Sequence, residues 1–208
     1  MKRVFDIIGA SLLLLLSLPL LFLAALGVKI SSPGPAFFSH RRVGRGGRHF
    51  GCLKLRTMVV NSEEWLENDS ELKAEYKGNG YKLPRHQDPR VTPVGHFLRF
   101  SHLDELPQLV NVLKGEMSLV GPRPLVKEEL EWYGEHEEEL LSVKPGIFGP
   151  WTGQGKGRVD YPERVEVELD YVRDRSLGKD VAILVRNVPV VLRGQAEKAE
   201  ARKEEMKS

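Results

Sequence analysis

The first thirty residues differ from the rest of the chain in their hydrophobic pattern. Apolar side chains fill almost every position from Ile7 to Ile30, without the polar face that an amphipathic helix shows. Such a run matches the roughly 20 residues that a helix needs to span the hydrocarbon of a bilayer. The pattern predicts a membrane-embedded helical segment over residues 1–30.

Ser17 and Pro19 interrupt this apolar run near its middle. Proline lacks an amide donor and its ring clashes with the carbonyl four residues earlier, here that of Leu15. The Ser17 hydroxyl can bond a carbonyl of the preceding turn and so help to satisfy the disturbed backbone. We therefore expect a kink or break at Ser17 and Pro19.

Basic residues stand at both ends of the run, and cationic flanks tend to stay on the cytoplasmic side. We therefore favour, by a small margin, a re-entrant helix-hairpin over a helix that crosses the membrane once. A cleaved signal peptide fits less well, because the apolar run is long and a basic cluster follows it. The flanking bases are Lys2, Arg3, Lys29, Arg41, Arg42, Arg45 and Arg48.

Beyond residue 30 the pattern becomes that of a mixed globular domain, 31–194. Two short strands are predicted on either side of a glycine-rich turn at Gly44–Gly47. Helical spacing follows over 62–76, 94–100, 106–113, 126–141, 163–175 and 179–192. The fold class is mainly α with a small β-hairpin. We expect amphipathic interfacial helices, with 179–192 either at the membrane interface or packed on the core.

Charge and cysteine content add two limits. Residues 1–60 hold nine Lys or Arg and one acid, whereas the remainder is acidic, so positive charge gathers where the chain would meet anionic headgroups or phosphate. The single cysteine, Cys52, excludes an internal disulfide framework. No HExxH or paired CxxC metal motif occurs. The charged tail, 195–208, is expected to be solvated.

The adjacent acids Asp104 and Glu105 are the strongest candidates for chemistry. Pro107 suits the first turn of a helix, so both acids should lie at or just before a helix start. A carboxylate can attack phosphorus, and a neighbouring one can hold a hard cation such as magnesium. An Asp-Glu step in this position more often caps a helix, and the pair alone leaves both interpretations open.

Four basic residues are candidates for phosphate binding, and each could instead form a structural contact. Arg123 lies between Pro122 and Pro124, which fix the backbone, and a planar guanidinium can bind two phosphate oxygens. Lys54 and Arg56 are two residues apart, which places them on one face of a strand. Arg99 lies about one helical turn before the acids.

Taken together, these segments resemble the bacterial monotopic phosphoglycosyl transferases, also called polyprenyl glycosylphosphotransferases or bacterial sugar transferases. The resemblance covers nearly everything except the tail. It is carried by "KRVFDIIGASLLLLLSLPLL", "KISSPGPAFFSHRRVGRGG", "KLRTM", "DPRVTPVGHFLR", "LDELPQLVNVLKGEMSLVGPRP", "KPGIFGPW" and "YVRDRSLGKDVAILVRNVPVVLRG".

The resemblance implies transfer of a sugar 1-phosphate from a UDP-sugar to undecaprenyl or another polyprenyl phosphate, with release of UMP. It implies a covalent phosphosugar on Asp104 and Mg²⁺ at Asp104 and Glu105. Phosphate contacts follow for Lys54, Arg56, Arg99 and Arg123, with Pro122 and Pro124 shaping the donor site. It further implies a membrane helix broken at Ser17 and Pro19, and a catalytic domain on the cytoplasmic face of the inner membrane.

Two segments depart from the family pattern. "KPGIFGPWTGQGKGR" replaces a segment that usually reads like "KPGLTGLWQVSGR", and "FLRFSH" replaces "FLRRTS". Trp151 and the segment "YVRDRSLGKDVAIL" resemble members that handle hexoses such as glucose or galactose. Because the chain begins at the re-entrant element, it resembles the minimal catalytic form, serving exopolysaccharide, capsule, O-antigen or lipopolysaccharide synthesis.

The main alternative is a membrane-anchored scaffold that binds anionic lipid through the basic hairpin without catalysis. It leaves the ordered "DELPQL", "GPRP" and "KLRTM" segments unexplained. A nucleic-acid binder is disfavoured, because the basic cluster lacks interleaved stacking aromatics and a recognition motif. The sequence leaves open which sugar is transferred and whether the chain forms a homo-oligomer.

Overall fold

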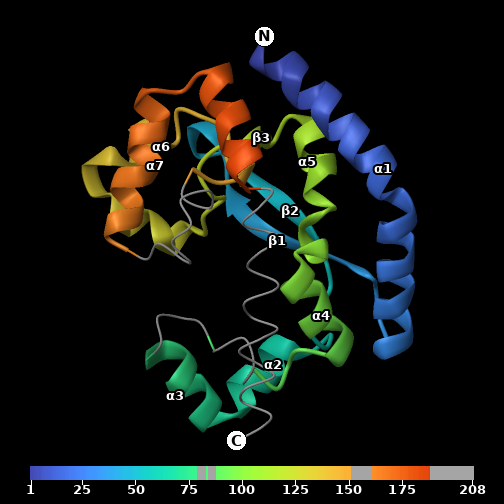
Figure 1. Ribbon diagram of the computed structural model, residues 1–208. Coiled ribbons are helices and arrows are strands. Elements are labelled where there is room, and N and C mark those ends of the chain that lie inside the picture. Colours follow the sequence, from blue (N-terminus) through green and yellow to red (C-terminus); the bar gives the residue numbers. More distant parts are fainter. Residues whose placement is uncertain (79–82, 84–87, 151–160, 188–208) are drawn as a thin grey trace, which may run out of the picture. The chain divides into compact units, whose positions relative to one another are not determined.

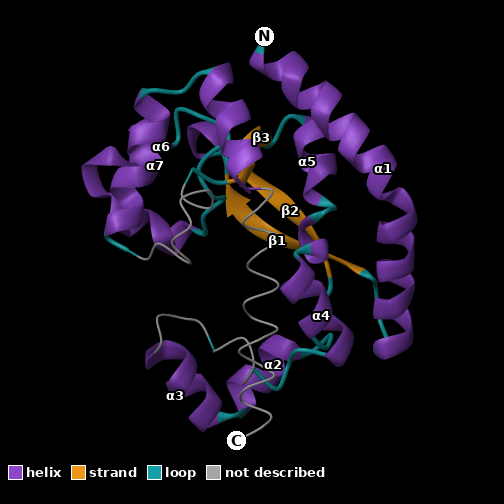
Figure 2. Cartoon of the chain, in the orientation of Figure 1, coloured by secondary structure: helices purple, strands orange, loops and turns teal. Residues whose placement is uncertain are grey.

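The computed structural model describes residues 1–78, 83, 88–150 and 161–187 (Figures 1 and 2). Helices dominate, with short strands between them, which confirms the mainly α class with a small hairpin. The elements are α1 (Lys2–Ser31), β1 (Phe37–Val43), η1 (Arg45–Gly47), β2 (His49–Leu55), α2 (Ser62–Asn68), α3 (Ser70–Gly78), α4 (Pro93–Ser101), η2 (Leu103–Glu105), α5 (Gln108–Lys114), β3 (Ser118–Val120), η3 (Lys127–His136), α6 (Glu137–Leu140), β4 (Gly146–Phe148) and α7 (Glu163–Arg173), where η denotes a 3₁₀ helix.

The chain forms two compact units, each built from separate stretches of sequence. The first unit comprises Met1–Leu16, Ser39–Leu53 and the chain from Pro107 onward, and the second comprises Ser17–Phe38 and Lys54–Leu106. The division passes through α1 at Ser17. Each half of the apolar helix therefore belongs with a different part of the globular chain.

Helix α1 is continuous from Lys2 to Ser31 and contains Pro19 in its interior. The helix is not interrupted at Ser17 and Pro19, since helical structure continues past the missing proline donor, and a kink at this point stays a prediction. Large apolar side chains are exposed along α1, including Leu15, Leu16, Phe22 and Leu23. By length and composition alone, α1 is the one helix among the described residues that could cross a membrane.

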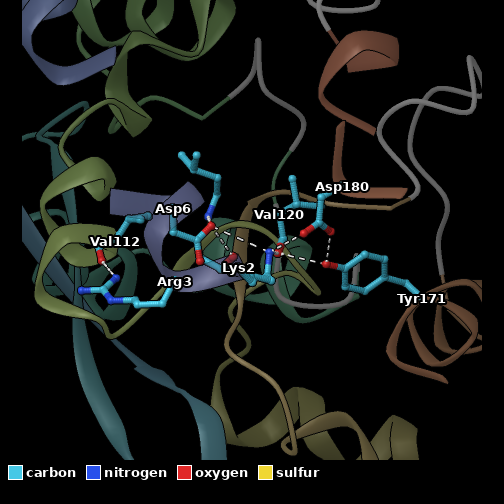
Figure 3. Close-up of polar contacts among 9 residues, drawn as sticks. Lys2, Arg3, Asp6, Val112, Val120, Tyr171 and Asp180 are labelled. Atoms are coloured by element: carbon cyan, nitrogen blue, oxygen red, sulfur yellow. Dashed lines mark hydrogen bonds and ion pairs between the residues drawn. The ribbon is translucent and has the colours of Figure 1, made fainter. Parts of the chain in front are cut away.

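In the first unit, the start of α1 is tied to the globular chain by buried polar groups (Figure 3). Asp6 Oδ1 accepts hydrogen bonds from Ser118 Oγ at 2.9 Å and from the Leu119 amide at 3.1 Å. The Lys2 ammonium donates to Asp180 Oδ2 at 2.7 Å. Asp6 and Asp180 are almost fully buried, so folding removes their carboxylates from water. These hydrogen bonds take the place of the lost contacts with water.

The described residues form two small strand pairs. The predicted hairpin is confirmed: β1 pairs with β2 around the glycine-rich turn, where Gly46 and Gly47 adopt positive φ. The sequence did not predict the parallel pair of β3 with β4, in which Ser118 lies opposite Gly146 and Val120 opposite Phe148. The first unit also has an apolar core, formed by Val43, Leu125, Leu130, Tyr133, Leu140 and Leu169.

In the second unit, the later half of α1 packs against α4 and the end of β2. Val28, Ala36, Leu55 and Leu98 form the buried core, and Leu21, Ala24, Ala25, Val94 and Leu103 pack against it. Leucine, valine and alanine side chains removed from water stabilise such a core by about 25 cal/mol per Å² of apolar surface. This core supports the segment that carries the candidate catalytic residues.

Two predicted helices differ from the structure in form. The helix expected over 62–76 is divided into α2 and α3, because the Asp69 carboxylate accepts from the Leu72 amide at 2.9 Å and caps a new start. The helix expected over 126–141 is mainly the 3₁₀ helix η3, which contains Gly134 at φ 48°, followed by the short α6. The remaining predicted helices, 94–100, 106–113 and 163–175, correspond to α4, α5 and α7.

The segment predicted as an interfacial or core-packed helix over 179–192 is helical from 177 to 187, where the described part ends. Asp180, Ile183 and Asn187 are buried, whereas Val181 and Val185 are exposed. One face thus packs on the protein and the other presents valines outward. Residues 188–192 and the tail 195–208 lie outside the described residues, as do Trp151 and the departures from the family pattern at Thr152 and before Arg158.

Candidate active site

Asp104 and Glu105 lie in η2, a single 3₁₀ turn that follows α4. The sequence placed them just before a helix start, and this is confirmed, since α5 begins at Gln108 with Pro107 as its N-cap residue. The Glu105 amide donates to the His102 carbonyl at 3.2 Å, which closes the turn. Asp104 is 8% exposed and counts among the buried polar residues, whereas the Glu105 side chain is 30% exposed.

The turn is entered through an uncommon backbone conformation at His102. This residue has φ 57° and ψ 14°, the left-handed region that L-amino acids rarely adopt. It is the only non-glycine residue with positive φ in the described part of the chain. The reversal at His102 ends α4 and directs the chain into the turn that carries Asp104 and Glu105.

Lys54 lies directly beside the acidic turn. Its Nζ atom is 2.8 Å from Glu105 Oε1, and both side chains are partly exposed, by 24% and 30%. The structure therefore brings together two of the residues that the sequence assigned to the site, although they are 51 positions apart. A lysine and a carboxylate in contact here can serve a substrate that carries both phosphate and a divalent cation.

Arg56 does not share the face of Lys54, as the spacing had predicted, because β2 ends at Leu55. The Arg56 guanidinium is buried and donates to the Ser32 hydroxyl and carbonyl, at 2.6 and 3.0 Å, and to the Pro35 carbonyl at 2.6 Å. A further bond reaches the Met58 carbonyl at 3.2 Å. Burial lowers the pKa of Arg56 from its ordinary value. These contacts give Arg56 a structural role at the turn that follows α1.

Arg99 is held against the same strand end through Thr57. Its Nε atom donates to Thr57 Oγ1 at 2.9 Å, and the Thr57 carbonyl accepts from the Thr92 amide at 3.0 Å, at the start of α4. The helix lies so close that a Cβ atom on Gly95 would stand 1.9 Å from the Thr57 carbonyl oxygen. Glycine at position 95 thus permits the approach that places Arg99 beside this segment.

Asp88 and Arg90 form a buried ion pair next to this segment, with two contacts of 2.8 Å between guanidinium and carboxylate. Burial by itself would raise the pKa of Asp88, but the hydrogen bonds and charge of Arg90, with a smaller contribution from Arg99, hold that pKa below its ordinary value. The pair therefore stays ionised at neutral pH. The Asp88 carboxylate also interacts electrostatically with Arg99.

The turn formed by Pro122, Arg123 and Pro124 belongs to the first unit. Three hydrogen bonds fix its backbone. The Pro122 carbonyl accepts from the Gly146 amide at 2.7 Å, the Pro124 carbonyl accepts from Arg42 at 3.4 Å, and the Arg123 amide donates to the buried carboxylate of Glu168 at 3.3 Å. The partly exposed Arg123 side chain therefore projects from a rigid turn.

Glu168 is a site-supporting residue that the sequence did not indicate. It is fully buried in α7, and its carboxylate also accepts from Tyr133 Oη at 2.6 Å and from Arg164 Nε at 3.0 Å. A glutamate in an ordinary helix carries no sequence signal of burial. Thr57 and Asp88 were missed for the same reason, although both lie within segments that the resemblance covers.

The two carboxylates of the acidic turn, Asp104 and Glu105, can be compared with the ligands that magnesium usually takes. No group of three or more His, Cys, Asp or Glu side chains that could hold a metal occurs in the described ranges. Magnesium in phosphoryl-transfer sites, however, is commonly held by one or two carboxylates together with substrate phosphates and water. Asp104 and Glu105 supply two carboxylates, so they fit a magnesium ion whose other ligands are phosphate oxygens and water.

Comparison with known proteins identifies the family. The family model for bacterial sugar transferases matches residues 1–194. An undecaprenyl-phosphate galactose phosphotransferase of Salmonella typhimurium is 46% identical over 198 residues, which are 93% of this chain and 40% of that protein. An exopolysaccharide production protein, ExoY, of Rhizobium meliloti is 43% identical over 191 residues, which are 91% of this chain and 84% of that protein.

A third relative is a UDP-glucose:undecaprenyl-phosphate glucose-1-phosphate transferase of Caulobacter vibrioides, 40% identical over 199 residues, 92% of this chain and 69% of that protein. The chain belongs to the bacterial sugar transferase family, which confirms the resemblance read from its motifs. It spans 40% of the length of the Salmonella relative, and 41% of an uncharacterized sugar transferase of Haemophilus influenzae that is 46% identical to it.

Proposed function

We propose that this protein is a phosphoglycosyl transferase that moves a sugar 1-phosphate from a UDP-sugar to a polyprenyl phosphate such as undecaprenyl phosphate. The observation that carries the proposal is the acidic turn itself. A buried aspartate, Asp104, stands next to a glutamate, Glu105, that contacts the Lys54 ammonium at 2.8 Å. Family membership and the names of the similar proteins support the same reaction.

The proposed chemistry has two displacements at one phosphorus atom. A carboxylate oxygen of Asp104 attacks the sugar-bearing phosphorus of the donor, and the bond from that phosphorus to the bridging oxygen breaks, so that UMP leaves. A phosphate oxygen of the polyprenyl phosphate then attacks the same phosphorus. The bond to Asp104 breaks, which restores the carboxylate and leaves the sugar on a polyprenyl diphosphate.

Positive charge is needed in both displacements, because negative charge accumulates on the phosphate oxygens. Lys54 and Arg99 are proposed to contact donor phosphates, and Arg123 is assigned a phosphate contact from its rigid turn. Arg56 keeps its predicted phosphate role only if it gives up the bonds to Ser32 and Pro35. A magnesium ion held by Asp104 and Glu105 would neutralise diphosphate charge and help UMP to leave.

A direct experiment follows the covalent intermediate. Full-length protein is incubated with a UDP-sugar and Mg²⁺ but without acceptor, and its intact mass is measured together with UMP release. We expect a mass increase equal to the sugar phosphate, which disappears when polyprenyl phosphate is added. Asp104→Asn should show neither adduct nor UMP release, because an amide cannot attack phosphorus. Turnover by folded Asp104→Asn protein would overturn the nucleophile assignment.

The same assay separates catalysis from the alternative of a lipid-binding scaffold. A well-folded protein that releases no UMP from any UDP-sugar tested would leave the scaffold as the better explanation. A donor screen addresses the sugar. We propose a hexose donor for an early step of exopolysaccharide or related surface-glycan synthesis, supported by the galactose and glucose named in the relatives. UDP-galactose and UDP-glucose are therefore compared with UDP-N-acetyl sugars.

We further propose that α1 enters the inner membrane from the cytoplasmic side and returns to it. Two observations support this topology. Lys2 and Asp6 near the start of α1 contact Asp180 and Ser118, and Val28 near its end packs in the core with Leu98. A helix that crosses a bilayer about 30 Å thick keeps one end away from a domain on the other side.

Pro19 allows such a helix to bend without a break in its assignment. Replacing Pro19 with Leu should straighten α1 and move the N-terminus toward the periplasm. A cysteine placed directly before Met1 reports this change, because a reagent that cannot cross membranes labels it from only one side. Cytoplasmic labelling that is unchanged in Pro19→Leu protein would argue against a role for Pro19 in the return.

A further inference from the structure

Basic side chains from three separate segments of the first unit converge around the start of α1. Lys2 and Arg3 lie in the first turn of α1, Arg45 lies at the exposed tip of the β1–β2 hairpin, and Lys144 lies two residues before β4. We call these four residues the cationic cluster. The sequence motifs assigned none of them to the catalytic site, and none has a part in the proposed transfer reaction.

Arg3 and Lys144 meet at Gly115, the residue that ends α5. A Cβ atom placed on Gly115 would lie 3.3 Å from Arg3 Nη2 and 3.5 Å from Lys144 Nζ. Gly115 has φ 85°, so glycine is favoured there for its backbone as well as for this space. Arg3 donates to the Val112 and Leu113 carbonyls at the end of α5, at 2.5 and 2.8 Å, which fixes its guanidinium in place (Figure 3).

The carboxylates near the cluster are already engaged. Asp180 accepts from Lys2 at 2.7 Å and from Tyr171 at 2.6 Å, and Asp6 accepts from Ser118 and the Leu119 amide (Figure 3). By contrast, the partly buried Lys144 ammonium forms no ion pair or hydrogen bond with any residue that the structure describes. Like charges held close together repel one another, and an anion bound among them offsets this repulsion.

The electrostatic balance at Lys144 agrees with this picture. Burial lowers the pKa of Lys144, and the positive charges of Arg3, Arg45 and Lys2 lower that pKa further, with only Asp6 acting in the opposite direction. A bound anion would oppose these effects by stabilising the charged ammonium. Positive charges thus outweigh negative ones around Lys144, which favours a negatively charged ligand there.

The geometry points to an anion site at which Arg3, Arg45 and Lys144 bind the phosphate of a membrane lipid headgroup. A phosphate presents several oxygens, so it can accept from a guanidinium and an ammonium at once. The lipid source follows from the position of Arg3, in the first turn of a helix whose exposed leucines suit hydrocarbon. Basic residues at such a boundary attract anionic lipid in the cytoplasmic leaflet.

The test follows the reactivity of the Lys144 amine in the full-length protein. Purified protein in a neutral detergent is treated briefly with an amine-acetylating reagent, and acetylation at each lysine is quantified by peptide mass spectrometry. Phosphatidylglycerol should slow acetylation of Lys144 by roughly fivefold, the factor that corresponds to one basic residue near an anionic surface. Phosphatidylcholine should have little effect, and phosphatidylglycerol should slow acetylation of Lys29, in the last turn of α1, less than that of Lys144.

Variants and a soluble anion complete the experiment. Arg45→Gln removes an exposed member of the cluster and should weaken the protection of Lys144, whereas the matched Lys29→Gln should not. Equal protection by inorganic phosphate at the same phosphate concentration would overturn the assignment to a lipid. Protection of Lys29 as strong as that of Lys144, or full protection in folded Arg45→Gln protein, would overturn the site itself. None of these readouts depends on transferase activity.

Discussion

The Lys54 ammonium lies 2.8 Å from the Glu105 carboxylate, although the two residues come from a strand end and from a turn far along the chain. The Lys54 ammonium thus contacts a carboxylate at which the sequence predicts a magnesium ion. In a site that binds a magnesium diphosphate, the lysine and the metal ion interact with the same carboxylate. In the proposed magnesium-dependent reaction, the Lys54 ammonium and the metal ion would therefore compete for Glu105.

Replacing Lys54 with Met tests this relationship. We expect turnover to fall by about 100-fold, because a cation that stabilises phosphate charge is lost. The Mg²⁺ concentration for half-maximal activity should fall as well, since Glu105 loses its competing partner. The control is Lys73→Met, which removes the lysine of the exposed Lys73–Glu67 pair. A Mg²⁺ requirement that is the same in Lys54→Met and wild-type protein would contradict the competition.

Arg56→Lys separates a structural role from phosphate binding. A lysine cannot reproduce the bonds of the guanidinium to Ser32, Pro35 and Met58, and it leaves partly buried carbonyls without these donors. The free energy of unfolding should fall by about 2 to 3 kcal/mol, measured by denaturant titration in detergent. Arg41→Lys, at an exposed position of β1, is the matched control. Unchanged stability together with a raised donor KM would instead support the phosphate assignment.

Gly95→Ala should disturb the packing of α4 on the strand end. The added methyl group would stand 1.9 Å from the Thr57 carbonyl oxygen, so α4 must move away and the bond between Arg99 and Thr57 must lengthen. We expect a loss of about 2 to 3 kcal/mol in stability and a higher donor KM. Gly178→Ala, where nothing lies within 4 Å, should change stability by no more than about 0.5 kcal/mol. Equal stability of the two variants would contradict the close approach.

The buried pair of Asp88 and Arg90 predicts a dependence of stability on acid pH. Because the pKa of Asp88 is lowered in the folded protein, its contribution is complete above the ordinary value of 3.8 and is lost as the pH falls through the folded pKa. Asp88→Asn should lower stability at neutral pH and flatten its decline below about pH 5. Unfolding curves measured at several pH values check this. An acid decline of equal steepness in both proteins would contradict it.

The parts of the fold that the sequence predicts correctly carry strong local signals. The glycine-rich turn located the β1–β2 hairpin, and Pro107 located the helix start after Asp104 and Glu105. The continuity of α1 through Pro19 was not predicted, because one missing hydrogen bond is a weaker constraint than the helical bonds on either side. Strands of three residues, such as β3 and β4, are too short to show a period.

The candidate site was predicted in part, for a related reason. The motifs identified Asp104, Glu105 and Lys54, which the structure places in one unit, and Lys54 and Glu105 in contact. The spacing of Lys54 and Arg56 was misleading, because alternation across a strand applies only while the strand continues, and β2 ends between them. Glu168 was missed because its burial depends on α7 packing against Tyr133, a tertiary contact without a local pattern.

The bonds from Arg56 to Ser32 and Pro35 connect the end of α1 to the strand end that carries Lys54. A helix adjusts its tilt to the thickness of the surrounding hydrocarbon, at a cost of a fraction of a kcal/mol per Å of mismatch. Because Arg56 lies two residues after Lys54, a change in tilt would shift the strand end that carries Lys54, the residue in contact with Glu105. Under the topology proposed above, we infer that the lipid surrounding α1 would influence how readily Lys54 and Glu105 separate to admit the donor.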